Sequence, residues 1–236
     1  MLKWSKANGK LQKLSKVPEI QPFLQNGRKV YSLDLLAGHT CPYSNECLSK
    51  VMDGKIVDGP NTKFRCYAAS LEALYKAKYA ADKHNTDAVR LAKTAPLIFS
   101  LLNDSMPKNL GVCRIHSSGD FFNQEYFDGW LKVAIHNPDK LFYAYTKNLK
   151  VWKNRIGKIP KNFVLTASYG GKLDSMIAEN NFRYAKVIFH THEACGMEID
   201  SDDSHAANPH KGSFCLLIHG VMPKGSDAAK AMSLNK

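Results

Sequence analysis

Short apolar runs alternate along the chain with segments in which apolar residues recur every three or four positions. A short apolar run is typical of a buried β-strand, and the longer spacing is typical of a helix with one buried face. Six strands are predicted in this way, at residues 30–36, 111–116, 141–145, 163–168, 185–190 and 214–219. Strands that alternate with helices indicate a parallel sheet with right-handed crossovers. We therefore expect an α/β protein of about six βα units.

Helices are predicted between these strands, at residues 68–81, 86–102, 124–137, 151–156 and 172–179. The third helix has the clearest boundaries, because Asn123 can cap its start and Pro138 follows its end. For the second helix, Asn85 or Thr86 is the expected N-cap, and Pro96 is expected to kink or divide it. The order of elements is compatible with an open doubly wound sheet and with a partial or complete βα barrel.

Polar and ionisable residues follow each predicted strand. In both architectures, the carboxyl ends of parallel strands meet at one edge of the sheet, where ligands bind. The residues expected at this edge are Gly38 to Cys41, His116 to Asp120, Tyr145 to Asn148, Ser168 to Gly171, His190 to Glu193 and His219. We expect a binding or active site there.

The chain is expected to have three parts. Residues 1–28 form a basic N-terminal arm, residues 29–222 form a single α/β domain, and residues 223–236 form a C-terminal tail. A cysteine-bearing loop at residues 38–66 follows the first strand of the domain. A chain of 236 residues is long enough for one such domain with a substantial core.

Charge and composition indicate which partners and which cellular compartment to expect. The 33 Lys and Arg residues against 21 Asp and Glu residues give a net charge of +12, which favours nucleic acid as a partner. A solvated lysine face is the alternative. No apolar run is long enough to span a membrane, and the N-terminus has no signal peptide pattern, so a soluble cytoplasmic protein is expected.

Three of the six cysteines are spaced as Cys41-x5-Cys47-x18-Cys66, in segments that have the character of loops. Thiolates in such positions are suited to a metal ion or to an iron–sulfur cluster. A [4Fe–4S] cluster would be held through three of its irons, whereas zinc would need a fourth ligand. The candidates for a fourth ligand are His39, His116, His190, His192 and Cys195. The alternative is that the cysteines are ordinary thiols.

Two of the remaining cysteines, Cys113 and Cys215, lie inside predicted strands and are expected in the core. The sequence His190-x-His192-x2-Cys195 leaves the fifth predicted strand and could either bind a second metal or provide structural hydrogen bonds.

A cysteine-rich loop after the first strand of a six-unit α/β chain resembles the radical S-adenosylmethionine enzymes. The compact C-x3-C-x2-C pattern of those enzymes is absent here. The resemblance implies a partial βα barrel, a [4Fe–4S] cluster and S-adenosylmethionine as a second cofactor. It also implies that the turn after the second strand binds the cofactor, through His116, Ser118, Gly119 and Asp120. Helix capping is the alternative role for this turn.

Four blocks of sequence, SLDLLAGHTCPYSNEC, FRCYAAS, RIHSSGDFFNQEYFDGW and FYAYTKNL, resemble the phage family named after gene product eighty-eight. The resemblance spans roughly residues 30–150. It implies a phage-encoded protein in the cytoplasm of the infected host cell and identifies no substrate.

The function expected from these observations is that of an iron–sulfur protein on a βα scaffold, with a radical-type enzyme as its extension. In that case the catalytic candidates are Asp120, Lys147 and His192. The alternative is a basic nucleic-acid-binding protein in which a zinc ion or a cluster has only a structural role.

Overall fold

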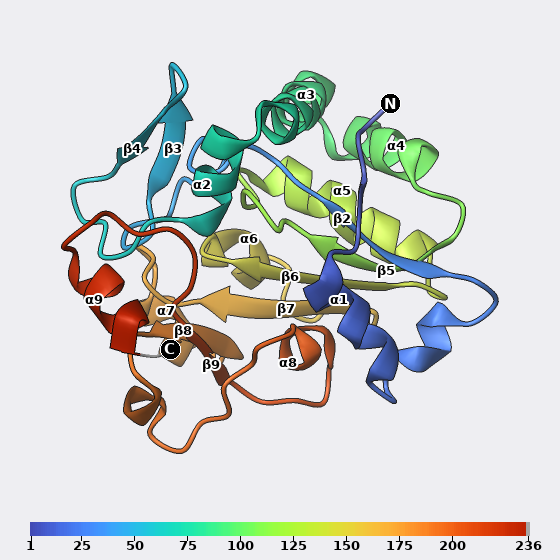
Figure 1. Cartoon of the computed structure of the whole chain (residues 1–236). Helices are drawn as coiled ribbons and strands as arrows, with labels where there is room; N and C mark the ends of the chain where they lie inside the picture. The colour runs from blue at the N-terminus through green and yellow to red at the C-terminus, as the bar shows by residue number, and fades with distance from the viewer. Residues whose placement is uncertain (235–236) are drawn as a thin grey trace.

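A computed structural model describes residues 1–234 and shows a seven-stranded sheet in the order β1-β2-β5-β6-β7-β8-β9 (Figure 1). Strand β1 is antiparallel to β2, and every other neighbouring pair is parallel. The strands are β1 (Ser5–Lys6), β2 (Lys29–Leu33), β5 (Leu110–Ile115), β6 (Leu141–Thr146), β7 (Phe163–Ser168), β8 (Tyr184–Ile188) and β9 (Phe214–Leu217).

The six parallel strands are the six that the apolar runs predict, and the mixed α/β class with a mostly parallel sheet is confirmed. These strands follow one another in the sheet in the same order as in the chain. Within residues 1–234 the sheet stays open, with β1 and β9 at its two edges, and does not close into a barrel. All six strands therefore point their carboxyl ends toward the same side of the molecule.

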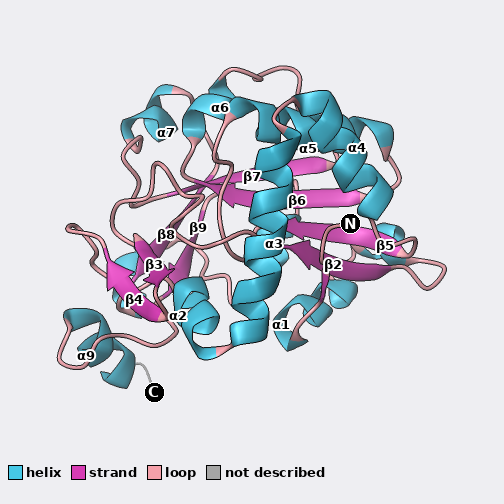
Figure 2. Ribbon diagram, turned by 90° about the horizontal axis from the view of Figure 1, so that it is seen from above, coloured by secondary structure: helices cyan, strands magenta, loops and turns pink. Residues whose placement is uncertain are grey.

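The larger core lies on the face of the sheet covered by α3 (Lys76–Ala92), α4 (Ala95–Ser105) and α5 (Gln124–His136). Figure 2 shows α4 to α7 along one side of the sheet and α1 on the other. Helix α5 contributes the fully buried Trp130 and Phe127, which pack against strand residues such as Phe142 and Phe163. Its N-cap is Asn123, whose side chain accepts a hydrogen bond from the Tyr126 amide, as predicted.

The opposite face of the sheet is covered by the N-terminal segment and by α8 (Ser204–Ala207). Leu11, Leu14 and Ile20 are buried against Val112, Tyr143 and other strand residues. The N-terminal segment forms β1, α1 (Gly9–Gln12) and two 3-10 helices, η1 (Lys13–Lys16) and η2 (Gln21–Leu24). Because both faces of the strands are covered, each strand is apolar at most of its positions.

Two helix boundaries differ from the sequence prediction. The helix predicted at 68–81 is divided at Tyr75 into α2 (Tyr67–Leu74) and α3. The helix predicted from Thr86 begins instead at Ala95, with Pro96 in its first turn, where a missing amide costs nothing. Asn85 and Thr86 are therefore not N-caps.

Asn85 and Thr86 lie buried in the middle of α3, where tertiary hydrogen bonds occupy them. The Asn85 side chain donates to the carbonyl oxygens of Lys3 and Asp34, and the Thr86 hydroxyl accepts from the Leu36 amide. The side-chain groups that could have capped a helix therefore join α3 to the sheet by hydrogen bonds.

A two-stranded hairpin that the sequence did not predict, β3 (Ser49–Met52) and β4 (Lys55–Asp58), lies within the cysteine-bearing loop. The remaining helices are α6 (Leu149–Lys153), α7 (Ser175–Glu179), η3 (Thr191–Ala194) and α9 (Asp227–Leu234). None of the helices in residues 1–234 is both long and apolar enough to cross a membrane.

Candidate functional site

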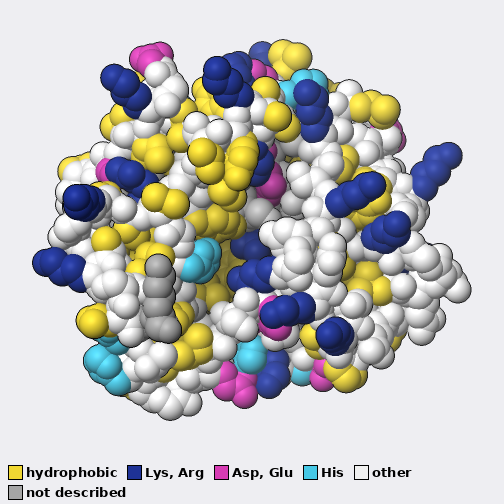
Figure 3. Space-filling model, in the orientation of Figure 1, with side chains coloured by type: hydrophobic (Ala, Val, Ile, Leu, Met, Phe, Trp, Pro, Cys, Tyr) yellow, Lys and Arg dark blue, Asp and Glu magenta, His cyan; other side chains and the backbone are white. Residues whose placement is uncertain are grey.

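The carboxyl ends of the six parallel strands surround a cavity of about 550 Å³. Its volume lies in the range of sites that bind small molecules. Every parallel strand contributes to the wall, through Asp34 after β2, Ser117 after β5, Tyr145 in β6, Ser168 in β7, Val187 in β8 and Leu217 in β9. Figure 3 shows a hollow in this face of the molecule, with Lys or Arg side chains and a His side chain beside it.

Cys41, Cys47 and Cys66 all line this cavity. Cys41 and Cys47 come from the loop after β2, and Cys66 is the residue before α2. The β3–β4 hairpin holds the two segments together, because Ser49 at its start accepts a hydrogen bond from the Cys66 amide at 3.2 Å. Each cysteine is half-buried, and no disulfide joins them.

The thiols lie close enough to affect one another electrostatically. Burial raises the pKa of Cys66 to about 12, and the neighbouring Cys47 adds to the rise. Burial also raises the pKa of Cys41 well above its ordinary value, with further contributions from Asp120 and Cys66. When no metal ion is bound, these two cysteines are therefore neutral thiols at pH 7.

The three cysteines do not form a site for a single metal ion. Among residues 1–234, no three or more His, Cys, Asp or Glu side chains are arranged to hold one ion. The Ser44 hydroxyl oxygen lies 3.2 Å from Cys47 Sγ.

The turn from His116 to Gly119 forms the next part of the wall. His116 has a positive φ of 66°, which is uncommon outside glycine. Burial, together with Arg114, lowers the pKa of His116 to about 3, so its ring is neutral at pH 7. Nε2 lies 3.0 Å from the Tyr126 hydroxyl oxygen, and Nδ1 is buried without a hydrogen-bond partner.

The turn is held by Asp34, a residue that the sequence analysis did not single out. Asp34 Oδ1 accepts hydrogen bonds from the amides of Ser117 at 2.7 Å and Ser118 at 3.3 Å. Helix α5 is capped by Asn123 instead, so the turn is not the cap of that helix. The apolar strand just before Asp34 was the only local signal that a polar residue there is buried.

Asp120 is buried, and its carboxylate accepts hydrogen bonds from the next residue and from the neighbouring strand end. Oδ1 accepts from the Thr146 hydroxyl at 2.6 Å and from the Phe121 amide, and Oδ2 accepts from the Lys147 amide at 2.8 Å. Burial raises its pKa to about 6 against these hydrogen bonds. Asp120 thus joins the ends of β5 and β6 beside the cysteines.

Lys147 also lines the cavity and is 7% exposed. Its Nζ donates to the Ser168 hydroxyl at 2.7 Å and to the carbonyl oxygens of Ser168 and Tyr169. All three acceptors are neutral. Lys147 is therefore a positioned cation whose charge no hydrogen-bonded carboxylate balances.

Four predicted site residues lie outside the wall of this cavity. His39 Nε2 is 2.9 Å from the Val51 carbonyl oxygen. His190 lines a neighbouring cavity, and its ring stacks on that of His192 at 5.5 Å. Cys195 is exposed. Cys113 and Cys215, expected in the core, are buried there.

A buried ion pair forms a further part of the wall. Arg114 Nη1 donates to Asp203 Oδ2 at 2.5 Å, and Lys10 Nζ lies 3.0 Å from Asp203 Oδ1. Burial acts to raise the pKa of Asp203, but Arg114 and Lys10 outweigh it and hold the pKa below its ordinary value. Asp203 thus ties the N-terminal arm and a C-terminal loop to β5.

The fold and the site together define an α/β protein with a mostly parallel sheet and a cavity at the strand ends that is lined by cysteines and by charged and apolar side chains. The chain belongs to the Gene product 88 family, whose model matches residues 2–233. The family expected from the four sequence blocks is therefore confirmed.

A relative is the Gene 88 protein of Mycobacterium phage L5, which is 30% identical over 119 residues. The matched stretch covers 47% of this chain and 44% of the relative, so the match spans less than half of that protein. No solved structure matches the chain.

Proposed function

We propose that the chain binds a [4Fe–4S] cluster through Cys41, Cys47 and Cys66, at the carboxyl ends of the parallel strands. The observation that carries the proposal is the position of these three cysteines. They come from two segments separated by a hairpin and line one cavity beside ionisable side chains. Cysteines that converge on one cavity from separate segments of the chain are suited to bind one metal group together.

The electrostatics of the cavity fit a cationic group. Two half-buried thiols with raised pKa values, Cys41 and Cys66, lie near each other, and Cys41 also lies near the Asp120 carboxyl. Their negative forms repel one another, and iron ions would relieve that repulsion by binding the thiolates. The charge of Lys147, whose Nζ is hydrogen-bonded to neutral acceptors, would in turn offset part of the negative charge that the thiolates bring to the cluster.

The proposed occupant is a cluster and not a single zinc ion. Tetrahedral zinc with Zn–S bonds of about 2.3 Å requires sulfur atoms about 3.8 Å apart. No such set of ligands is assembled among residues 1–234. In a cluster, by contrast, each cysteine binds a different iron, which places the three sulfur atoms farther apart.

A cluster held by three cysteines leaves one iron free to face the cavity, which is large enough for a small organic cofactor. S-adenosylmethionine is the proposed second cofactor, and its reductive cleavage is the chemistry that such a cluster supplies when bound. The strand order supports the finer proposal of a partial βα barrel, because adjacent strands in the sheet are also consecutive βα units. In this scheme His116 and the turn to Asp120 orient the cofactor.

The first experiment is to purify the protein without oxygen and to measure iron, acid-labile sulfide and zinc per chain. We expect about four irons and a matching amount of sulfide. The triple variant Cys41→Ser, Cys47→Ser, Cys66→Ser should lose both, whereas Cys195→Ser, which changes an exposed cysteine outside the cavity, should keep both. Stoichiometric zinc, or iron retained by the triple variant, would overturn the proposal.

A second measurement separates a radical-type enzyme from a cluster with another role. Adding S-adenosylmethionine to the reduced protein should change the electron paramagnetic resonance spectrum of the cluster. An unchanged spectrum would refute the enzyme extension and leave cluster binding intact.

Nucleic acid binding is the second candidate function, and the net charge of +12 favours it. In the basic stretch at residues 147–161, some of the cationic side chains already make contacts within the protein. Arg155 is paired with Asp128, and Lys150 lies over the Tyr43 ring at 5.3 Å, which leaves Lys153 less engaged. Binding to a DNA or RNA oligonucleotide that weakens steeply with salt, and that is weaker and less salt-dependent in Lys150→Met, Lys153→Met, would support this candidate.

A further inference from the structure

The cavity contains more positive charge than its acidic residues balance. Its wall contains six cationic side chains against three acidic ones, namely Lys6, Lys10, Arg65, Lys78, Arg114 and Lys147 against Asp34, Asp120 and Asp203.

Two of these cations are balanced locally. Arg65 pairs with Asp58, which lies outside the wall, and Lys78 pairs with Asp34 and Asp82. Four cations and two carboxylates then remain. This excess is large enough to attract a dianion.

Three of the remaining cations, Lys6, Lys10 and Arg114, form what we call the cationic wall. Lys10 and Arg114 share the single carboxylate of Asp203, so their ammonium and guanidinium groups lie close together. Lys6, on β1, lines the same cavity, and its side chain makes no hydrogen bond or ion pair with any residue in 1–234.

The bonds of the cationic wall also leave donors free for a ligand. Lys10 Nζ lies 3.0 Å from Asp203 Oδ1, and this contact helps to hold the pKa of Asp203 low. An ammonium group has three N–H donors, so Lys10, whose side chain is 32% exposed, can donate to a ligand in the cavity while it stays beside the buried Asp203. Arg114 Nε has no hydrogen-bond partner.

Aromatic rings stand next to these cations. The Arg114 guanidinium lies 5.4 Å from the centre of the Tyr145 ring, and the rings of Tyr67 and His219 are 5.3 Å apart. Burial lowers the pKa of His219, and Lys10 and Arg114 add to that effect, which shows that the ring senses the same positive field. A flat, apolar ligand body would find contact surfaces here.

We propose that this cavity binds a nucleoside monophosphate, with its phosphate at the cationic wall and its base against Tyr67, Tyr145 and His219. A phosphate monoester carries a charge of about −1.5 to −2 at pH 7, which matches the excess of two cations better than a single carboxylate does. The aromatic rings can stack on a nucleobase, and we therefore place a base on the other side of the ligand. The site uses none of the three cysteines, so it does not depend on the proposed cluster.

The test is calorimetric titration of the full chain, purified without oxygen, with the four common ribonucleoside monophosphates. The matching nucleosides, inorganic phosphate and a 5′-phosphorylated oligonucleotide are titrated as comparison ligands. The double variant Lys6→Met, Lys10→Met should weaken binding of the monophosphate by about tenfold or more. The control is Lys13→Met, Lys16→Met, which removes two charges from the same arm at residues outside the cavity and should leave the affinity unchanged.

The outcomes are distinct. Equal affinity for a nucleoside and its monophosphate, equal weakening by the two double variants, or binding of the oligonucleotide in preference to every mononucleotide would each overturn the proposal. Repeating the titration with Cys41→Ser, Cys47→Ser, Cys66→Ser should preserve nucleotide binding. Cluster binding and nucleotide binding can therefore fail independently.

Discussion

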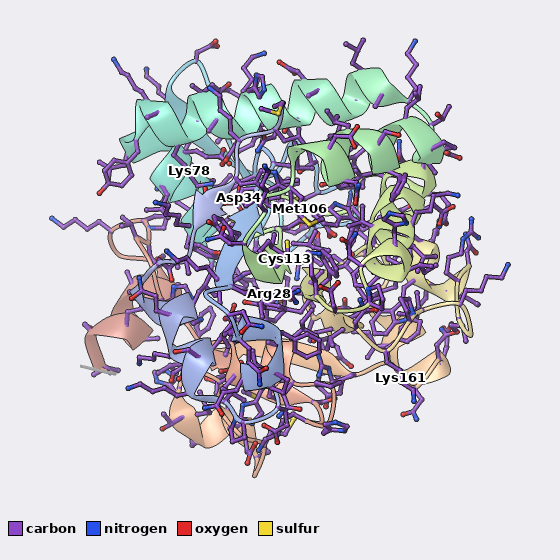
Figure 4. All side chains as sticks on the ribbon, turned by 90° about the vertical axis from the view of Figure 1, so that its right-hand side faces the viewer. Arg28, Asp34, Lys78, Met106, Cys113 and Lys161 are labelled. Atoms are coloured by element: carbon purple, nitrogen blue, oxygen red, sulfur yellow. The ribbon has the colours of Figure 1, made fainter. Side chains whose placement is uncertain are left out.

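Replacing Asp34 with Asn should destabilise the protein strongly, because this carboxylate joins three parts of the structure around the cavity. It is 3% exposed. Oδ1 accepts from the amides of Ser117 and Ser118, and Oδ2 accepts from Lys78 Nζ at 3.0 Å. Figure 4 shows Asp34 below α3, the helix that carries Lys78.

The magnitude follows from these bonds. An Asn side chain has one acceptor oxygen, so it can serve the two amides or Lys78 but not both, and it places an NH₂ donor against the other. A hydrogen bond to a charged group contributes about 1.5–3 kcal/mol, and breaking a buried ion pair costs about 3–5 kcal/mol. Because Lys78 keeps Asp82 at 2.6 Å, we take the lower end, about 3 kcal/mol.

The assay is thermal unfolding followed by circular dichroism at pH 7. For a chain of this size, a loss of about 3 kcal/mol lowers Tm by about 6–12 °C. The matched control is Asp87→Asn, which removes the same charge from an exposed pair with Lys83 and should leave Tm nearly unchanged. A decrease for Asp34→Asn no larger than for Asp87→Asn would refute the reasoning.

Two further predictions concern the turn after β5. Gly119→Ala should lower Tm more than Gly157→Ala does. Both glycines have a positive φ, but only at Gly119 would the new Cβ lie 2.7 Å from the Thr40 hydroxyl oxygen. Equal decreases would show that this steric contact does not matter. The free energy of unfolding should fall as the pH decreases from about 6.5 to about 3, since unfolded His116 takes up a proton in this range and native His116, with its pKa of about 3, does not. The slope from this residue is at most about 1.4 kcal/mol per pH unit and should be missing in His116→Asn, so parallel curves for the two proteins would contradict the prediction.

The strands could be predicted from the sequence because their signal is local. Runs such as those around Phe142 and Phe163 are apolar at nearly every position, and a strand covered on both faces requires that pattern. The cap of α5 at Asn123 was predictable for the same reason, since it depends on residues only three positions apart.

The helix boundaries near Tyr75 and Thr94 could not be predicted locally. Asn85 and Thr86 have the chemistry of N-caps, but in the folded chain they bind backbone groups just before β1 and just after β2. Tertiary hydrogen bonds thus outweighed local preference, and α3 continued through both residues.

The sequence by itself determined the α/β class, the six parallel strands and the order in which polar residues follow them, because periodicity and strand ends are properties of neighbouring residues. Only the tertiary structure decided which of those residues share a cavity. It placed Cys66 beside Cys41 and Cys47 through a hairpin that shows no strong local pattern, and it left His190 and Cys195 outside the wall. It also joined Lys10 to Asp203, which lie far apart in the chain. Such contacts depend on how the arm and loops pack on the sheet, and no short stretch of sequence encodes that packing.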